Sequence, residues 1–257
     1  NQGDVTSAVF SLDSRFLITS SRDSTIRFWS VPEGQMVKEL SVPDVLDGVR
    51  SAALHPNQRW VAFRAGPQIW LYDIDKQQPV GKSPYVIPGT PAESPVAIRS
   101  LAFSADGTQI LAGADDNMPH VWAIATGEHA ALSPTEGLPG HQAAVLSFVQ
   151  SGDGRYFASL STDRVMVWES FSQAPWVLQR PLQQESDGVT YAGQLLFSPD
   201  NHHLAAATTS GIVRIWDLRH SDAPPQQLVL HTSAITGITF SPDGQLLAST
   251  ARNGAVA

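Results

Sequence analysis

The segment AGQLLFSPDNHHLAAATTSGIVRIWD, residues 192–217, carries the pattern that decides the fold. A short apolar run ends at Phe197, the turn SPDN follows, and a second apolar run leads to the polar turn TTSG. A third run then ends at Trp216. Asp, Asn, Gly and Pro favour tight reversals of the chain, whereas short runs rich in Val, Ile, Leu and Phe favour strands. The segment therefore predicts a small antiparallel sheet.

The same template occurs five more times along the chain. The other copies begin at Val5, Val49, Ile98, Val145 and Ile235. The last residue before the first turn recurs every 43 to 49 residues, at Phe10, Leu54, Phe103, Gln150, Phe197 and Phe240. In the five repeats that have a closing aromatic residue, it follows 18 or 19 positions later. These spacings indicate copies of one structural unit, with approximate boundaries at 1–44, 45–92, 93–140, 141–187, 188–230 and 231–257.

The repeats also predict how the sheets are assembled. A single sheet of this kind exposes two apolar faces, so it gains stability by stacking on its neighbours. A closed stack leaves only short, protected edges. Gly, Pro and β-branched residues recur inside every repeat, which argues against helices. We therefore predict an all-β protein, a β-propeller of four-stranded antiparallel blades with five full blades and part of a sixth.

These residues resemble the WD-repeat family over essentially the whole chain. Trp216–Asp217 is the dipeptide that gives the family its name, and Gly140–His141 matches its Gly-His pair. The other closing pairs depart from the pattern, and they are Trp29–Ser30, Tyr72–Asp73, Trp122–Ala123 and Trp168–Glu169. The resemblance implies a ring of blades, most often seven, which would need about seventy more residues at this period. We therefore expect the chain to be part of a longer protein.

In this family a His, a Ser or Thr, an Asp and the closing Trp of one blade form a buried hydrogen-bonded network. The fourth repeat matches every position, with His141, Ser159, Asp163 and Trp168. Partial copies comprise Thr19, Asp23 and Trp29; Asp116 and Trp122; Trp216; and His231 and Ser249. The third and fifth repeats place Ala112 and Ala206 where the hydroxyl belongs. The resemblance implies a structural role, because buried indole, imidazole and hydroxyl groups need hydrogen-bond partners.

A His–Ser–Asp set also fits a hydrolase. We reject that interpretation because the set recurs in other repeats as incomplete copies, which suits a structural element. In addition, a buried network cannot present a nucleophile to a substrate. The chain also contains no G-x-S-x-G elbow. We therefore expect no catalytic residues.

Partner contacts in propellers of this family often use the top rim of the ring. The resemblance places these positions at Asp4, Arg22, Arg50, Arg99, Asp115, Tyr191 and Arg252. Four of the seven are arginines, in a chain whose net charge is −8. The arginine fork donates two parallel hydrogen bonds to a carboxylate or phosphate. We therefore expect a basic rim that binds a protein or peptide partner, with an acidic partner as the natural match.

Three other features attract functional hypotheses. Asp200, His202 and His203 have metal-ligand chemistry but lie in the first turn of the fifth repeat, so we interpret them as an exposed polar turn and predict no metal or cofactor. Trp176 lies in the insertion at 169–188, either on an outer strand or on a partner-facing loop. Pro84, Pro88, Pro91 and Pro95 mark a long connection that we expect to be an exposed loop and a possible docking element.

Composition narrows the function. The net charge of −8 argues against broad attraction to nucleic acid or to an anionic membrane. The absence of cysteine excludes thiolate chemistry and fits a reducing compartment, so we expect a cytoplasmic protein. The missing cysteines, the many Ala and Gln residues and the SPDG turn also suggest a bacterial source.

Three hypotheses for function remain open. We favour a non-catalytic protein-interaction scaffold or sensor domain, whose partners include other domains of the same polypeptide. The alternative is a propeller attached to a catalytic signalling module, an ATPase or kinase, or one that binds a small ligand in its central channel. A third is nucleic-acid binding through the arginine rim, which predicts affinity that falls steeply with salt.

Overall fold

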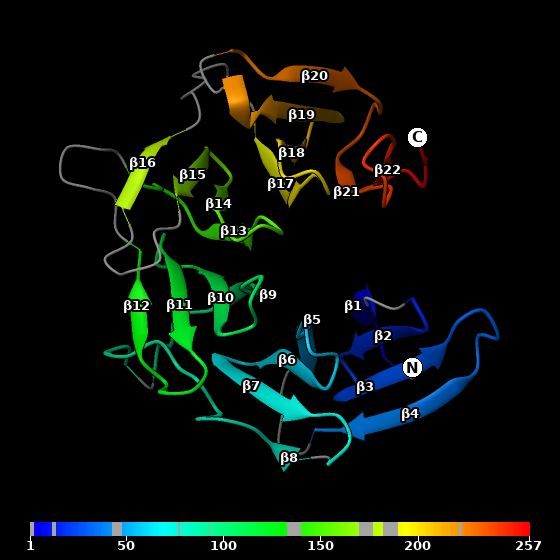
Figure 1. Cartoon of the computed structure of the whole chain (residues 1–257), viewed down its shortest axis with the longest axis vertical. Helices are drawn as coiled ribbons and strands as arrows, with labels where there is room; N and C mark the ends of the chain where they lie inside the picture. The colour runs from blue at the N-terminus through cyan, green and yellow to red at the C-terminus, as the bar shows by residue number, and fades with distance from the viewer. Residues whose placement is uncertain are drawn as a thin grey trace. The chain divides into compact units, whose positions relative to one another are not determined.

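The computed structural model describes residues 3–11, 14–42, 48–76, 78–91, 93–132, 140–169, 177–181, 190–220 and 223–257 (Figure 1). These residues form strands joined by turns, with one short 3₁₀ helix at Leu218–His220. The predicted all-β class is confirmed. None of the described helices has the length and hydropathy to cross a bilayer.

The described strands make five four-stranded sheets and one two-stranded sheet, and in each sheet every strand pairs with the next along the chain. The first sheet comprises β1 (Val5–Phe10), β2 (Phe16–Ser21), β3 (Thr25–Ser30) and β4 (Met36–Ser41), and the second β5 (Val49–Leu54), β6 (Trp60–Ala65), β7 (Gln68–Asp73) and β8 (Gln78–Pro79). The third comprises β9 (Ile98–Phe103), β10 (Gln109–Ala114), β11 (Pro119–Ala123) and β12 (His129–Ala131), and the fourth β13 (Val145–Gln150), β14 (Tyr156–Ser161), β15 (Val165–Glu169) and β16 (Val177–Pro181). The fifth comprises β17 (Tyr191–Phe197), β18 (His203–Thr208), β19 (Ile212–Asp217) and β20 (Gln226–Val229), and the sixth β21 (Ile235–Phe240) and β22 (Leu247–Ala251).

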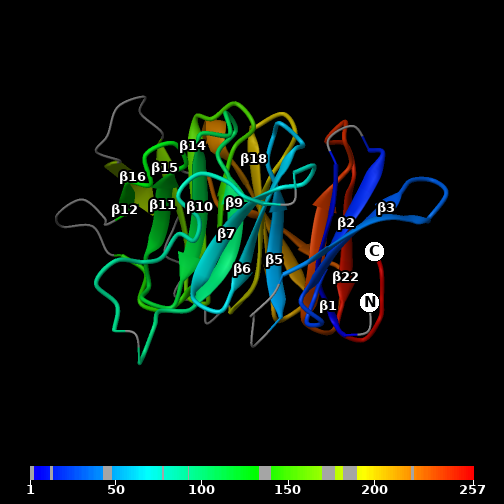
Figure 2. The same cartoon turned by 90° about the horizontal axis from the view of Figure 1, so that it is seen from below.

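The chain divides into two compact units. The first contains residues 1–112 and 120–130, and the second contains residues 113–119 and 131–257. Within the first unit, β1 packs beside β5, and β5 packs beside β9. Within the second, β13 packs beside β17, and β17 packs beside β21. Figure 2 shows β5, β6 and β7 of the first unit running side by side as one sheet.

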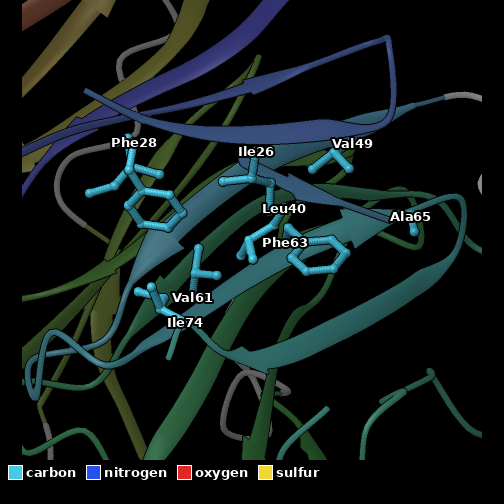
Figure 3. Close-up of a cluster of buried hydrophobic side chains, with 9 residues drawn as sticks. Ile26, Phe28, Leu40, Val49, Val61, Phe63, Ala65 and Ile74 are labelled. Carbon is cyan, nitrogen blue, oxygen red and sulfur yellow. The ribbon is translucent and has the colours of Figure 1, made fainter. Parts of the chain in front are cut away.

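The core of the first unit lies between its first two sheets (Figure 3). Ile26 and Phe28 on β3 face Val61 and Phe63 on β6, and all four side chains are buried. Alternate residues of a strand point to opposite faces. The other face of the second sheet is therefore free to meet the third, where the His55 ring packs on Phe103 with ring centres 4.8 Å apart.

The second unit shows the same two-sided packing on β18. Leu204 and Ala206 belong to a core shared with the fourth sheet, whereas Ala205 and Ala207 belong to a core shared with the sixth. The run of alanines lets neighbouring sheets approach closely on both faces. This explains why the strand sequences show little alternation of apolar and polar residues.

The turn after the first strand has one recurring construction. In the third to sixth sheets, the hydroxyl of a serine donates to an aspartate two residues later, as from Ser151 to Asp153 at 2.6 Å. The same serine oxygen accepts the backbone N–H five residues on, for example that of Tyr156 at 2.9 Å. The second sheet replaces the pair by His55 and Asn57. These side chains fix the tight reversals predicted from the Asp, Asn and Gly content.

Candidate functional site

The fourth sheet holds a continuous chain of buried polar contacts. The indole N–H of Trp168 donates to Ser159 Oγ at 2.9 Å, and Ser159 Oγ lies 2.7 Å from Nε2 of His141. On the other side of the imidazole ring, Nδ1 lies 2.9 Å from Ser161 Oγ. The Ser161 hydroxyl donates in turn to Asp163. Ser161 was missed by sequence reasoning, although it stands two residues before Asp163.

The hydrogen bonds fix the proton positions in this network. An indole nitrogen can only donate, so Ser159 accepts from Trp168 and has its own hydrogen left for His141 Nε2. His141 then carries its proton on Nδ1 and donates to Ser161. Burial lowers the pKa of His141 from 6.5 to about 4, which keeps the ring neutral at physiological pH.

The same geometry removes the hydrolase alternative for this set. Ser159 and Ser161 are both 0% exposed, so neither hydroxyl can reach a substrate. Burial by itself acts to raise the pKa of Asp163, but hydrogen bonds from Ser161 and Arg164 hold it below its ordinary value. Arg164 Nε donates to Asp163 at 2.7 Å. The carboxylate is therefore an anchor for Ser161 and Arg164.

Some hydrogen bonds of this network also form in the first and sixth sheets. In the first sheet, Trp29 donates its indole N–H to Thr19 Oγ1 at 2.8 Å. The Asp23 carboxylate in this sheet accepts hydrogen bonds from the backbone N–H of Thr25 and from Arg27 Nη1, the latter at 2.9 Å. In the sixth sheet, His231 Nε2 lies 2.7 Å from Ser249 Oγ.

The prediction that Trp122 and Trp216 join such networks is wrong. Trp122 donates instead to the backbone oxygen of Val86, at 3.2 Å, and Asp116 accepts from the backbone of Met118. Among the residues that the structure describes, buried Trp216 Nε1 has no hydrogen-bond partner. The reason in both cases is the alanine at the hydroxyl position.

The candidate rim residues of the first unit separate into different environments. Arg22 and Asp4 are exposed and form an ion pair at 3.7 Å. Arg99 is also exposed, and its backbone oxygen accepts from Ser51 Oγ at 3.3 Å. Arg50 is half-buried and lies directly opposite Arg64 across β5 and β6. Arg64 was not among the predicted rim residues, although it follows Phe63 on the face opposite the core.

The rim residues of the second unit differ again. Arg252 is exposed, and Asp115 is half-buried. Tyr191 is only 6% exposed, and its hydroxyl accepts from Arg214 at 3.3 Å. The prediction that Tyr191 offers a partner contact is therefore wrong, because its ring belongs to the core between the fourth and fifth sheets.

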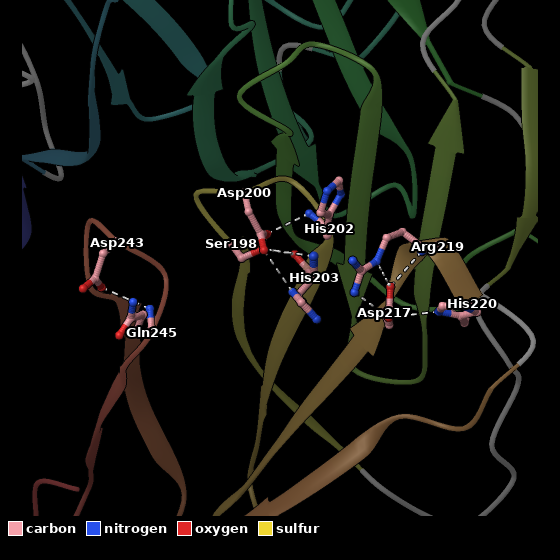
Figure 4. A network of polar contacts seen from close by, with 9 residues as sticks. All are labelled: Ser198, Asp200, His202, His203, Asp217, Arg219, His220, Asp243 and Gln245. Atoms are coloured by element: carbon pink, nitrogen blue, oxygen red, sulfur yellow. Dashed lines mark hydrogen bonds and ion pairs between the residues drawn. The ribbon is translucent and has the colours of Figure 1, made fainter.

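The predicted polar turn at Asp200 lies near a second charged group (Figure 4). Asp200 accepts from Ser198 and from the backbone of His202, and the Ser198 hydroxyl lowers its pKa. Figure 4 shows the His202 and His203 rings directed apart. Within the described ranges, no three His, Cys, Asp or Glu side chains are arranged to hold a metal ion.

The second charged group is centred on Asp217, from the Trp-Asp dipeptide. Arg219 donates two hydrogen bonds to its carboxylate, each at 3.0 Å, and His220 Nδ1 lies 3.1 Å away. The hydrogen bonds from the Arg219 guanidinium, and to a smaller extent the contact with His220, hold the pKa of Asp217 well below its ordinary value. Trp176 lies outside the described residues.

The comparisons with known proteins agree with this architecture. The model of the family "WD domain, G-beta repeat" matches residues 1–30, 81–123, 132–169, 177–217 and 223–257. It passes over residues 31–80, which nevertheless contain the strands of the second sheet.

Three curated proteins illustrate the range of relatives. "Pre-mRNA-processing factor 19 homolog 2" of Arabidopsis thaliana is 28% identical over 61% of this chain and 29% of its own length. "Protein LST8 homolog" of Drosophila melanogaster is 26% identical over 68% of this chain and 54% of its own length. "Transducin beta-like protein 2" of Mus musculus is 23% identical over 97% of this chain and 68% of its own length. Because the family model matches more than half of the sequence, the chain belongs to the WD domain, G-beta repeat family.

Proposed function

We propose that this chain is a non-catalytic interaction domain that holds protein or peptide partners. The observation that carries the proposal is the contrast between its two groups of polar residues. The His141 network is buried and its members bond to one another, so it stabilises the sheet. Arg22 and Arg99, in contrast, are exposed on the first unit.

The partner we infer is acidic. Arg22, Arg50 and Arg99 place three cations on one unit of a chain whose net charge is −8. Guanidinium groups bind carboxylate and phosphate groups with directed, paired hydrogen bonds. Such charges set specificity and association rate more than total affinity.

The relatives support the class of function and leave the details to experiment. The chain spans 29% of the length of the plant relative and 54% of that of the insect relative. From these relatives we therefore propose only the general class of function, an interaction domain. The relatives come from a plant, an insect and a mouse, and they give no support to a bacterial source. Location in the cytoplasm and a sensor role within a larger polypeptide stay predictions.

The proposal is tested by capturing partners with a charge-reversed variant. The test variant changes Arg22, Arg50 and Arg99 together to Glu. The matched control changes Arg15, Arg59 and Arg155 to Glu, because these are exposed arginines beside the first turns of their sheets and give the same change in net charge. Both are compared with the unaltered full-length protein by quantitative affinity purification.

We expect the test variant to lose its partners at least tenfold while the control keeps them. Salt should weaken capture by the unaltered protein, because exposed charge pairs are screened. Equal capture by all three proteins would reject the arginine surface. Turnover of a substrate by the isolated chain would reject a non-catalytic role.

A further inference from the structure

A groove lies beside the core that the first two sheets share. Its volume is about 530 Å³, within the range of about 300–1,000 Å³ that is common for small-ligand sites. Its walls contain large apolar side chains, which are Phe16, Ile18 and Phe28 from the first sheet, Leu54 from β5, and Ile74 directly after β7. Figure 3 shows Phe28 and Ile74 at one end of the core and Val49 and Ala65 at the other. The groove therefore extends one end of the core towards the surface.

A β-bulge in the edge strand β4 shapes the outer wall of this groove. Phe28 pairs with Lys38 across β3 and β4. The next pair joins Trp29 to Met36, so Val37 is an extra residue on β4. A bulge bends its strand and redirects the neighbouring side chains. Val37 and Lys38 would point to opposite faces of a regular strand, but here both line the groove.

Lys38 places a positive charge against the apolar wall. Its side chain is half-buried, and its ammonium group donates to the backbone oxygen of Ile74, across from the first sheet to the second. In the described part of the chain this is the one hydrogen bond that the Lys38 side chain makes. An ammonium group carries three hydrogens. Two donors therefore remain for a ligand.

The neighbouring carboxylates have other cations as partners. Asp75 also lines the groove, but it pairs with Arg59 at 3.7 Å. Glu39, next to Lys38, accepts from Arg27 Nε at 2.7 Å. Among the described residues, no carboxylate lies within ion-pair distance of Lys38. Because water and salt screen a half-buried charge less than an exposed one, an anionic ligand would interact favourably with Lys38.

We propose that this groove binds a small apolar carboxylate, such as a medium-chain fatty acid. The hydrocarbon chain lies against Phe28 and Leu54, and the carboxylate accepts from Lys38. The single cation beside an apolar wall matches a ligand with one charged head group, because a few polar groups fix the orientation of a ligand in an apolar site. The site is separate from the proposed arginine surface, since Phe16 begins β2 and Arg22 follows the opposite end of that strand. The inference therefore goes beyond binding of a protein partner.

The test is isothermal titration calorimetry of the full chain with octanoate, hexanoate, octanol and octylamine. The test variants are K38M, which removes the charge but keeps an apolar stem, and V37D, which puts a negative charge on the wall. K38R restores the cation. The matched controls are K76M and M36D, because Lys76 and Met36 are exposed neighbours outside the groove. Thermal unfolding checks that each variant is folded.

We expect octanoate to bind the unaltered chain, K38R, K76M and M36D with similar Kd values. Hexanoate should bind about fifteenfold more weakly, because each buried CH₂ changes Kd about fourfold. K38M should weaken octanoate binding at least about tenfold, the usual effect of losing a hydrogen bond to a charged group. It should leave octanol binding unchanged. V37D should weaken octanoate binding as strongly as K38M, and octylamine should bind the unaltered chain more weakly than octanol.

The other outcomes overturn the proposal. Octanol that binds as tightly as octanoate would show that Lys38 does not recognise the carboxylate. Octanoate binding that persists in V37D would place the ligand elsewhere, and a loss in K38M without rescue by K38R would make Lys38 a structural link to Ile74. Tighter binding of N-acetyl-alanyl-leucine than of octanoate would make the occupant the C-terminus of a partner. No binding of any probe would remove the site and leave partner capture by the arginines unaffected.

Discussion

At the scale of single residues, one side chain on the second strand of a sheet decides the state of the closing tryptophan. Thr19 and Ser159 each accept the indole N–H of their own sheet, at 2.8 and 2.9 Å. Ala206 occupies the same register position in the fifth sheet, and no described residue accepts the buried indole N–H of Trp216. A single missing oxygen therefore leaves one donor unsatisfied in an otherwise similar sheet.

This comparison predicts that Ala206→Ser stabilises the protein. The new hydroxyl would stand where Ser159 stands and accept the N–H of Trp216. One satisfied buried hydrogen bond contributes about 1 kcal/mol, and urea unfolding measures the change.

The matched control is Ala205→Ser, one residue earlier on the same buried strand. Its hydroxyl would enter the apolar core that contains Val213 and Ile235, and an unsatisfied buried hydroxyl costs about 1–3 kcal/mol. If both serine variants lose stability equally, the register argument fails.

The buried imidazole of His141 predicts a loss of stability in mild acid. Its pKa is about 4 in the fold, below the ordinary 6.5, because burial disfavours the charged ring. The unfolded chain therefore takes up this proton first as the pH falls. The contribution of neutral His141 is complete above about pH 6.5 and is lost by about pH 4, a change of about 3 kcal/mol.

The measurement is the free energy of unfolding at about pH 7 and pH 4.5 for the unaltered chain, His141→Gln and His202→Gln. The exposed His202 side chain serves as the control. We expect His141→Gln to be less stable at pH 7 and to lose less on acidification. A pH dependence unchanged by His141→Gln would show that other groups produce it.

Some residue-level features follow from sequence and others do not. The bond between Thr19 and Trp29 follows from the repeat, because equivalent positions on paired strands meet at a fixed register. The link through Ser161 does not, because this position varies among the repeats: it holds Ser21 and Thr208 in two others and alanine in the rest. Nor does the burial of Tyr191, whose position in the repeat matches that of exposed Asp4. Its aromatic ring gains more by packing in the core than by facing water.

At the scale of elements, glycine fixes how one sheet meets the next. Gly211, in the turn between β18 and β19, has a φ of +85°, and its carbonyl accepts from the backbone of Leu230 and His231. A Cβ added there would lie 2.0 Å from the backbone oxygen of His231. The turn needs glycine both for its conformation and for this close approach.

We therefore expect Gly211→Ala to lower the free energy of unfolding by more than the backbone conformation alone would explain. Gly254 provides the comparison, because it has nearly the same φ, +82°, but nothing within 4 Å of an added Cβ. Gly254→Ala should cost about 1–2 kcal/mol, the penalty for a left-handed non-glycine residue. Gly211→Ala should exceed it by at least about 2 kcal/mol in urea unfolding, because the backbone at His231, in the connection between β20 and β21, must move. Equal costs would show that the contact with His231 yields freely.

Strand positions were predictable from sequence because each turn carries its own local signal. The pairing of Ser with Asp two residues later, as in Ser198 and Asp200, favours a tight reversal in any context. Which face of a strand meets which neighbour was not predictable in β18, where three alanines in a row give no alternation. The structure resolves this by burying both faces.

At the scale of the whole molecule, stability should vary along the chain because each sheet depends on its neighbours. In a repeat protein each unit contributes its own stability and its contacts with the next unit. The fifth sheet has four strands and is packed on one face by the fourth and on the other by the sixth. In the described part of the chain, the sixth has two strands, together with one isolated bridge between Thr250 of β22 and Val256.

This difference predicts a gradient in hydrogen exchange within the second unit. Backbone amides of β22 should exchange at least about tenfold faster than those of the equivalent strand β18, a gap of about 1.4 kcal/mol in opening free energy. Leu246 and Val256, beside β22, are 72% and 74% exposed, so little apolar burial opposes opening there. Mass spectrometry of peptides that cover Leu247–Ala251 and His203–Thr208 measures both rates. Repeating it at tenfold lower protein concentration provides the control, since protection of β22 that disappears on dilution would come from self-association. Equal protection of both strands at both concentrations would contradict the dependence of each sheet on its neighbours.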